Sequence, residues 1–393
     1  MPEFFNYDEL TWPEVATLPR DTPLILPLGS GYDFNLLADR LGNPTRIGIL
    51  PPCPFGWKGS GLELPKIVLG RYVGNLITSL RADGFTAAYC VTPDDGSGTP
   101  YLVLPNAEYQ IALHRSGMDT QENLLPPDSE HGKVVLMPIG HTEQHGLHLP
   151  LSVDTHIIEA IARGTAARVP SRACTLPVMP YGVSTHRPSF AGTLSAGGRS
   201  FEDFWLGAMD VLVARGFDRF YLMSGHGGNM SFLVNVVKYA GERYRRIFCA
   251  TAFLHTSGMI GAAALEKYRT SKIGGMGHAC ELETSFMLHL HPELCHMDRV
   301  VDETDFIATP SYYMDWIEGG SLIANPPWDD DTRTGAYGAG SHATAEKGRL
   351  WLESAIEEKV QHVEEIHEQQ ERREARRNAG FGLWGTASKD AGH

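Results

Sequence analysis

Cysteine is scarce in this chain, and no two cysteines are spaced as they are in zinc ribbons or redox motifs. Six cysteines are scattered singly over 393 residues. This spacing argues against a disulfide framework and favours a reducing compartment. No run of about 18 apolar residues is present, so no membrane span is predicted. The first residues contain neither a basic segment nor a long apolar core, which argues against a secretory signal. We therefore expect a cytoplasmic protein.

Positive charge is scarce as well. The chain has 33 Lys and Arg against 47 Asp and Glu, for a formal net charge of −14. An excess of negative charge repels nucleic acids and anionic membranes, so we expect neither as a partner. The apolar content of 42% is ordinary for a globular protein, and the length allows two or three domains. The 42 glycines and 25 prolines indicate tight turns and shaped loops.

The first part of the chain resembles the second part, which suggests an internal repeat. Three segments of the first part match three of the second in the same order: residues 24–30 with 135–141, 50–56 with 176–182, and 80–96 with 212–228. We interpret residues 1–115 as a degenerate half-repeat that has lost its functional residues and serves packing or assembly. The alternative is that any two strand–helix–strand units share apolar runs and Gly-Phe turns.

The second part alternates between strand and helix patterns. Apolar runs at residues 134–138 and 217–223 are typical of buried strands, and residues 155–168 and 201–214 have helical spacing. We expect Asp154 and Ser200 to cap these two helices. This alternation predicts an α/β fold, a mostly parallel sheet flanked by helices. We assign residues 131–365 to a metal-binding catalytic domain and 366–393 to a charged helix end and a flexible tail. The helix expected over 344–378 becomes highly charged, which is typical of a solvated face.

The most informative cluster follows the first of these strands. Glu143, His145 and Asp154 lie within twelve residues, in a polar loop directly after the apolar run. In an extended segment Glu143 and His145 point to the same side. Imidazole and carboxylate groups are ligands for zinc, manganese and iron. A polar loop with chance His and Glu is the plainer interpretation.

Two further clusters contain the same residue types. His226 lies in a Gly-rich loop after the second buried strand, where a single histidine is more often structural. His278, Glu281 and Glu283 precede an apolar helical run, and on one helix His278 and Glu281 would face the same side. Alternatively, the two glutamates are acidic first-turn residues favoured by the helix dipole.

Together these clusters resemble the creatininase family of metal-dependent amidohydrolases. The matching blocks are residues 140–150 with Asp154, 190–194, 225–229, 278–285, 292–294 and 343–348. The resemblance covers residues 134–357 and implies the fold of that family. It also implies a site with two divalent cations, zinc before manganese or iron. The implied metal ligands are Glu143, His145, Asp154, His226 and Glu281.

One position departs from creatininase itself, where the loop after the metal-binding histidine carries a tyrosine and a glutamate. This chain has Gly227 and Gly228 there. We therefore expect Glu281 to supply the missing carboxylate and a small-molecule substrate other than creatinine. The resemblance further implies His278 and Glu283 as catalytic residues. The expected substrate-binding residues are His186, Ser184 and Gly227.

The predicted reaction is hydrolysis of a C–N bond in a small amide, cyclic amide or formamide. Metal-activated water would attack the carbonyl carbon, and a protonated His278 would give a proton to the leaving nitrogen. A peptide-trimming metallohydrolase and a non-catalytic binding or scaffold protein are the alternatives. By resemblance we also expect a homo-oligomer, with a hexamer as one form.

Overall fold

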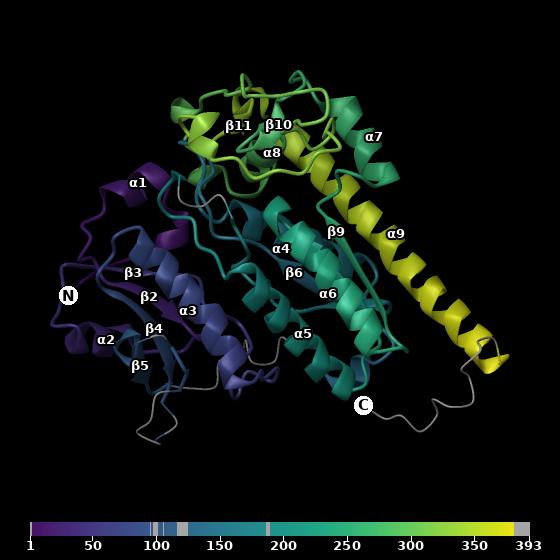
Figure 1. The fold of residues 1–393 in the computed structure, drawn as a ribbon, viewed down its shortest axis with the longest axis horizontal. Coiled ribbons are helices and arrows are strands. Elements are labelled where there is room, and N and C mark those ends of the chain that lie inside the picture. Colours follow the sequence, from purple (N-terminus) through teal and green to yellow (C-terminus); the bar gives the residue numbers. More distant parts are fainter. Residues whose placement is uncertain are drawn as a thin grey trace.

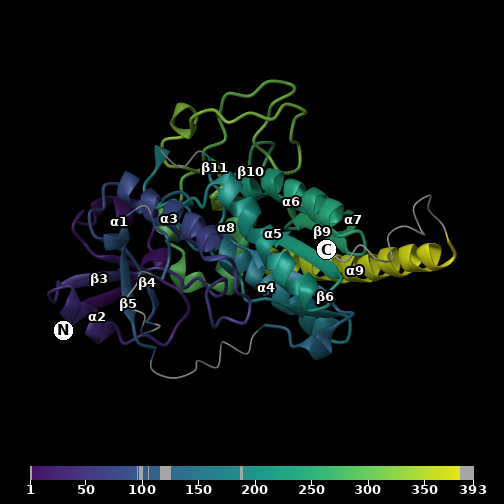
Figure 2. The ribbon, with the colours of Figure 1, turned by 60° about the horizontal axis from the view of Figure 1, so that its bottom comes forward.

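The computed structural model describes residues 2–94, 96, 101–104, 106–115, 125–185 and 189–380. The described chain forms two parallel β-sheets, each flanked by helices (Figure 1). Figures 1 and 2 show the N-terminal sheet at one side of the molecule and the long C-terminal helix at the other. The predicted α/β class is confirmed.

The N-terminal sheet has the order β1-β3-β2-β4-β5, and all its strand pairs are parallel. Its strands are β1 (Glu3–Asn6), β2 (Leu24–Pro27), β3 (Arg46–Ile49), β4 (Ala88–Pro93) and β5 (Gln110–Leu113). The helices of this half are α1 (Trp12–Thr17), α2 (Phe34–Arg40) and α3 (Lys66–Ala82).

The second sheet has the order β7-β6-β8-β9, again with parallel pairs. Its strands are β6 (Val134–Ile139), β7 (Ala173–Thr175), β8 (Arg219–Ser224) and β9 (Phe248–Phe253). Every residue of β6 and β8 is buried, as expected of central parallel strands. The helices of this half are α4 (Val153–Arg168), α5 (Gly198–Ala214), α6 (Met230–Arg243), α7 (Met259–Tyr268), α8 (Glu281–Leu290) and α9 (Ala345–Asn378). A short antiparallel pair, β10 (Met276–His278) and β11 (Tyr337–Gly338), lies above the sheet edge.

Apart from the additional edge strand β1, the two sheets share one strand order. The remaining strands of the N-terminal sheet are ordered β3-β2-β4-β5, and those of the second sheet β7-β6-β8-β9. The crossover helices also correspond, with α2 and α3 in the first half and α4 and α5 in the second. This shared order is what a duplication predicts, and an internal duplication stays our interpretation of it.

The corresponding helices α3 and α5 pack against each other between the two sheets. Tyr72 of α3 stacks on Phe204 of α5 with ring centroids 4.4 Å apart, and its hydroxyl donates to the carbonyl of Tyr181. One hydrophobic core therefore includes residues of both halves. A second core lies on the other face of the second sheet, under α4, α8 and α9.

The loop after β2 corresponds to the predicted metal-binding loop after β6, but aromatic and cationic groups cover it. The indole of Trp57 lies against Gly29, where a Cβ would come within 2.5 Å of the ring. The Arg115 guanidinium lies 4.5 Å from the centre of that indole and donates to the carbonyl of Ser30. Packing thus fills the position where the second half has its polar cluster.

The helices expected in the second half are present with shifted starts. The helix predicted from residue 155 begins at Val153, so Asp154 lies in its first turn and is not its cap. The helix predicted from residue 201 begins at Gly198, so Ser200 is inside it. Thr344 caps α9 by accepting a hydrogen bond from the Lys347 amide, and α9 continues to Asn378. The tail after residue 380 lies outside the described residues.

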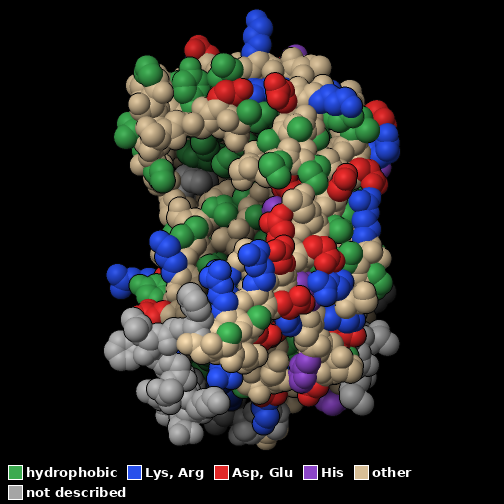
Figure 3. Space-filling model, turned by 90° about the vertical axis from the view of Figure 1, so that its right-hand side faces the viewer, with side chains coloured by type: hydrophobic (Ala, Val, Ile, Leu, Met, Phe, Trp, Pro, Cys, Tyr) green, Lys and Arg blue, Asp and Glu red, His purple; other side chains and the backbone are tan. Residues whose placement is uncertain are grey.

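The surface of α9 is charged, as predicted. Figure 3 shows acidic and basic side chains mixed along the face that α9 crosses. In the upper part of the same view, hydrophobic side chains border a hollow. Over the described ranges, no helix is both long enough and apolar enough to cross a membrane.

Candidate metal centre

The site begins with two loops that leave neighbouring strands at the same edge of the second sheet. Pro138 and Ile139 of β6 pair with Met223 and Ser224 of β8. The loops that follow therefore start side by side, and ligands bind at this carboxyl edge in open α/β sheets. The first loop contains Glu143, and the second brings its histidine next to it.

Asp154 lies between two histidines, one on each of its carboxylate oxygens. Its Oδ1 is 3.2 Å from Nε2 of His145, and its Oδ2 is 3.4 Å from Nδ1 of His226. Nδ1 of His226 is also 2.9 Å from Oε1 of Glu143. All four side chains are buried. An aspartate placed in this way can bridge two cations.

The third predicted cluster completes the arrangement. His278 ends β10, and its Nδ1 is 3.7 Å from Oε1 of Glu143. Glu283, in the first turn of α8, forms a group with His145 and Asp154 in which the potential ligand atoms lie within 4.8 Å of one another. Loops distant in the sequence therefore place three histidines and three carboxylates in one buried cluster.

Backbone carbonyls fix the orientation of these three histidines. His145 Nδ1 donates to the carbonyl of Glu143 at 3.0 Å, and His226 Nε2 donates to that of Val183 at 3.0 Å. His278 Nε2 donates to the carbonyl of Gln144 at 2.6 Å. A neutral imidazole has one N–H and one lone pair, so the other nitrogen of each ring presents its lone pair to the cluster. Metal-binding histidines are typically held in this way.

The expected metal ligand Glu281 lies elsewhere, and this corrects the ligand set. Its carboxylate accepts from the backbone amides of Thr270 and Ser271 at 2.9 and 2.8 Å, and Lys347 Nζ is 2.5 Å away. Residues two apart on a helix point to different sides, so α8 turns Glu283 to the cluster and Glu281 away from it. His278 and Glu281 do not share a helix, because α8 begins at Glu281.

The sequence interpretation did not assign His141, which the structure places against the cluster. Its ring is fully buried and stacks on His226, with centroids 4.3 Å apart. His141, Glu143 and His226 form another group that could hold a metal by proximity alone. The sequence feature that could have identified His141 is its position two residues before Glu143 in the same loop.

Of the three expected substrate-binding residues, the structure describes Ser184 and Gly227. Ser184 is buried near the cluster, and its hydroxyl has no hydrogen-bond partner among the described residues. Gly227 lies under the indole of Trp316, so a Cβ there would come within 2.3 Å of the ring. A Cβ at Gly228 would lie 2.4 Å from His226 Nε2. His186 lies outside the described residues.

The electrostatics of the cluster favour positive charge. Burial lowers the pKa of His145 and His226, but Asp154 and Glu143 outweigh it and raise the pKa of His145 to about 9 and that of His226 well above its usual value. Burial raises the pKa of Glu283 to about 7. Histidines that retain protons beside buried carboxylates occupy positions where a cation would be stabilised.

The segment between α8 and α9 and the N-terminal segment cover this edge of the sheet (Figure 2). Trp328 packs on His278 with ring centroids 4.9 Å apart. The Trp12 indole donates to the carbonyl of Thr334 at 2.8 Å and packs on Phe190. The Trp328 ring therefore covers one side of His278.

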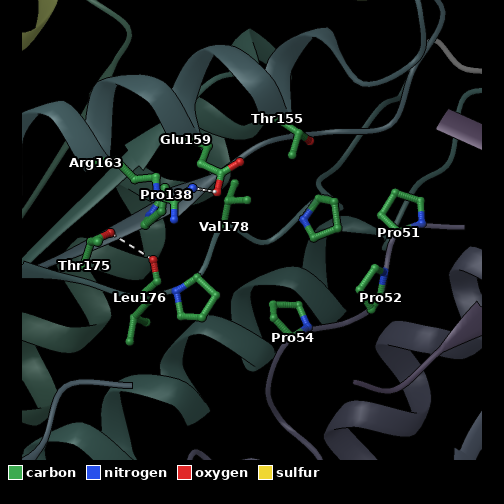
Figure 4. Close-up of a pocket in the computed structure, with 12 residues that line it drawn as sticks. Pro51, Pro52, Pro54, Pro138, Thr155, Glu159, Arg163, Thr175, Leu176 and Val178 are labelled. Atoms are coloured by element: carbon green, nitrogen blue, oxygen red, sulfur yellow. Dashed lines mark hydrogen bonds and ion pairs between the residues drawn. The ribbon is translucent and has the colours of Figure 1, made fainter. Parts of the chain in front are cut away.

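A separate cavity of about 330 Å³ lies where the two halves meet (Figure 4). The corresponding proline loops after β3 and β7 line it, together with the ion pair of Glu159 and Arg163 from α4. Six of its twelve lining residues are prolines, and the stick view shows their rings around it. Its lining includes none of the histidines or carboxylates of the cluster, so we place the candidate site at the cluster.

Comparisons with known proteins match the part of the chain that contains the cluster. A model of the creatinine amidohydrolase family matches residues 124–363. The mycofactocin precursor peptide peptidase of Mycobacterium ulcerans is 30% identical over 236 residues, which cover 58% of this chain and 84% of that protein. Creatinine amidohydrolase of Pseudomonas putida is 30% identical over 242 residues, 57% of this chain and 86% of that protein. A solved structure described as "Creatininase Mn" shares the fold with a TM-score of 0.52 at 24% identity, covering 61% of this chain and 92% of that chain.

Proposed function

This chain belongs to the creatininase family of hydrolases, and from that premise we propose that it uses two divalent cations to hydrolyse a C–N bond in a small amide, cyclic amide or formamide. The observation that carries the proposal is the convergence of three histidine lone pairs and three carboxylates in one buried cluster. This donor set suits zinc, with manganese or iron as alternatives.

Charge supports two cations over one. With the carboxylates ionised and the histidines neutral, as metal ligands must be, Glu143, Asp154 and Glu283 give the buried cluster three negative charges. Buried charge of one sign is costly unless it is compensated. Two divalent cations would supply four positive charges and leave one net positive charge, which suits a reaction that develops negative charge on a carbonyl oxygen.

The side chains divide into two sets that share Asp154. Glu143 and His226 would hold one cation, and His145 and Glu283 the other, with the two oxygens of Asp154 facing the two sets. When bound, such cations polarise a carbonyl and lower the pKa of water.

His278 remains for proton transfer. Its Nε2–H is held by the Gln144 carbonyl, so only Nδ1 faces the cluster. Burial, with the neighbouring His145, lowers the pKa of His278 to about 3 in the metal-free cluster, which favours a ring that is neutral at rest. His278 therefore takes a proton from water at Nδ1 before it delivers that proton to the leaving nitrogen. A ring that is protonated at the start, as expected from the sequence, is the alternative order.

The substrate we propose is not creatinine. Gly228 leaves no space for a side chain beside His226, whereas creatininase carries a carboxylate in this loop. The Ser184 hydroxyl has no hydrogen-bond partner among the described residues and would be available for a polar group of the substrate. A peptide substrate is the second candidate, because the mycofactocin precursor peptide peptidase is as similar to this chain as creatinine amidohydrolase is.

The test is the metal content of protein purified without chelator, together with hydrolysis assays. We expect about two equivalents of zinc, manganese or iron per chain and a loss of metal in Glu143→Ala. Assays with small amides, cyclic amides, formamides and short peptides would then separate the two candidate substrates. A chain that binds no metal after incubation with zinc and manganese would refute the proposal and favour a binding or scaffold role.

A further inference from the structure

We propose that His141 is a positioning residue that presents an N–H to Glu143, although proximity groups it with potential metal ligands. The inference rests on the proposed function, because it concerns how this chain holds one of the two cations. His141 lies two residues before Glu143, and its ring is fully buried. Its role depends on which of its nitrogens carries the proton.

A backbone contact at Gly182 shows which nitrogen of His141 carries the proton. The amide N–H of Gly182 donates to Nδ1 of His141 at 2.9 Å. A backbone amide can only donate, so His141 Nδ1 must present its lone pair there. The single N–H of the neutral ring is therefore on Nε2. A ring in this tautomer has no lone pair left for a metal at Nε2.

The next residue imposes the opposite tautomer on the neighbouring histidine. The carbonyl of Val183 accepts from Nε2 of His226, so the nitrogen that faces the cluster is Nδ1, 2.9 Å from Glu143 Oε1. Nδ1 donates a proton to that oxygen when no cation is bound, and would present its lone pair to a bound cation. Gly182 and Val183 therefore set two stacked rings in opposite states. With a cation bound, His226 presents a lone pair to the cluster, and His141 presents an N–H.

The two oxygens of Glu143 face these two rings separately. Oε1 lies by His226, whereas Oε2 lies 3.9 Å from Nε2 of His141. The two rings stack with centroids 4.3 Å apart and an angle of 28° between their planes, so each covers one face of the other. At 3.9 Å the contact is electrostatic and longer than a hydrogen bond, and through it the N–H of His141 would draw Oε2 toward the ring and leave Oε1 for the cation. Glu143 thus acts through one oxygen.

A matched pair of variants tests this role. His141→Gln keeps an N–H near the Nε2 position, and His141→Phe keeps a flat ring but removes both nitrogens. Zinc affinity would be measured by competition with a chelator, and zinc per chain by mass spectrometry, with His226→Phe as the ligand-loss control. Groups that orient a metal ligand typically contribute about 10–100-fold in affinity. We expect His141→Phe to bind two zinc ions, one of them about 10–100-fold more weakly, and His141→Gln to stay within a few-fold of the wild type.

Two results would overturn the inference. Loss of a full equivalent of zinc in His141→Phe, as in His226→Phe, would make His141 a ligand. Unchanged affinity in His141→Phe would mean that its N–H does nothing. If the wild type binds no zinc, the proposed function fails, and that result is distinct from both.

A measurement on the unmodified chain does not depend on how the variants fold. Long-range ¹⁵N–¹H spectra of histidine-labelled protein identify the protonated nitrogen of each ring, and His141→Gln assigns the signal. We expect His141 to be protonated at Nε2 and unprotonated at Nδ1, with and without zinc. A signal that loses its Nε2 proton on zinc addition would refute the inference.

Discussion

Two glutamates of α8, Glu281 and Glu283, are predicted to have different effects when each is changed to glutamine. The change at Glu283 should lower zinc affinity, and the change at Glu281 should lower stability. Glu283 lies with His145 and Asp154, within 4.8 Å between ligand atoms. Two unit charges 4 Å apart interact by about 4 kcal/mol at an effective dielectric constant of 20. Each 1.4 kcal/mol is about tenfold in affinity. Removing the charge of Glu283 should therefore lower the affinity for one of the two zinc ions by at least about 100-fold.

Glu281→Gln is the matched control. Its carboxylate is buried against Lys347 and two backbone amides, so the change breaks a structural ion pair and does not touch the cluster. Breaking a buried pair from one side costs about 3 kcal/mol. The hydrogen bonds and Lys347 hold the pKa of Glu281 below its usual value despite burial. Stability from this carboxylate is therefore present above pH 4.5 and lost as the pH falls through the lower folded pKa.

Zinc per chain after dialysis against a weak chelator, and unfolding in urea with and without zinc, would separate the two effects. Glu283→Gln should keep about one equivalent of zinc and nearly normal stability without metal. Glu281→Gln should keep two equivalents and unfold at lower urea concentration. The opposite pattern, in which Glu281→Gln loses the zinc, would refute the assignment.

Three further changes test other contacts. Gly228→Ala would push a Cβ to 2.4 Å from His226 Nε2, so we expect it to lower zinc content, measured by mass spectrometry; normal zinc content would contradict this packing. Gly241→Ala lies in α6 with open space around its Cβ, so it should raise the free energy of unfolding by about 1 kcal/mol in a urea titration. The metal-free protein should lose stability between pH 6.5 and about 9, because the pKa of His145 is raised on folding and its contribution is complete only below 6.5. Zinc should remove that pH dependence, and urea unfolding across the range, with and without zinc, checks both statements. Trp12→Phe keeps an aromatic ring but loses the indole hydrogen bond, and should lower the free energy of unfolding by about 1 kcal/mol in the same assay.

The fold class and most of the cluster could be predicted because their signals are local. The apolar run before Glu143 and the alternation of strands and helices indicate strand ends at one edge of a parallel sheet. The three clusters meet there, as their residue types suggested.

What could not be predicted depends on contacts between distant segments. That Glu283 faces the cluster and Glu281 does not depends on α8 beginning at Glu281, and on Lys347 meeting the carboxylate that points away. The tautomer of His141 depends on a backbone amide 41 residues later in the chain. Neither contact leaves a pattern in the local sequence.

The packing of α3 on α5 has a consequence for synthesis on the ribosome. The apolar side of α3, with Tyr72, is translated long before Phe204 of α5 exists to cover it. At about 5–20 residues per second, that surface waits on the order of ten seconds for its partner. During this interval the emerging N-terminal half is a client for chaperones that shield apolar helices. Early termination before α5 should therefore yield aggregates, not a free folded domain.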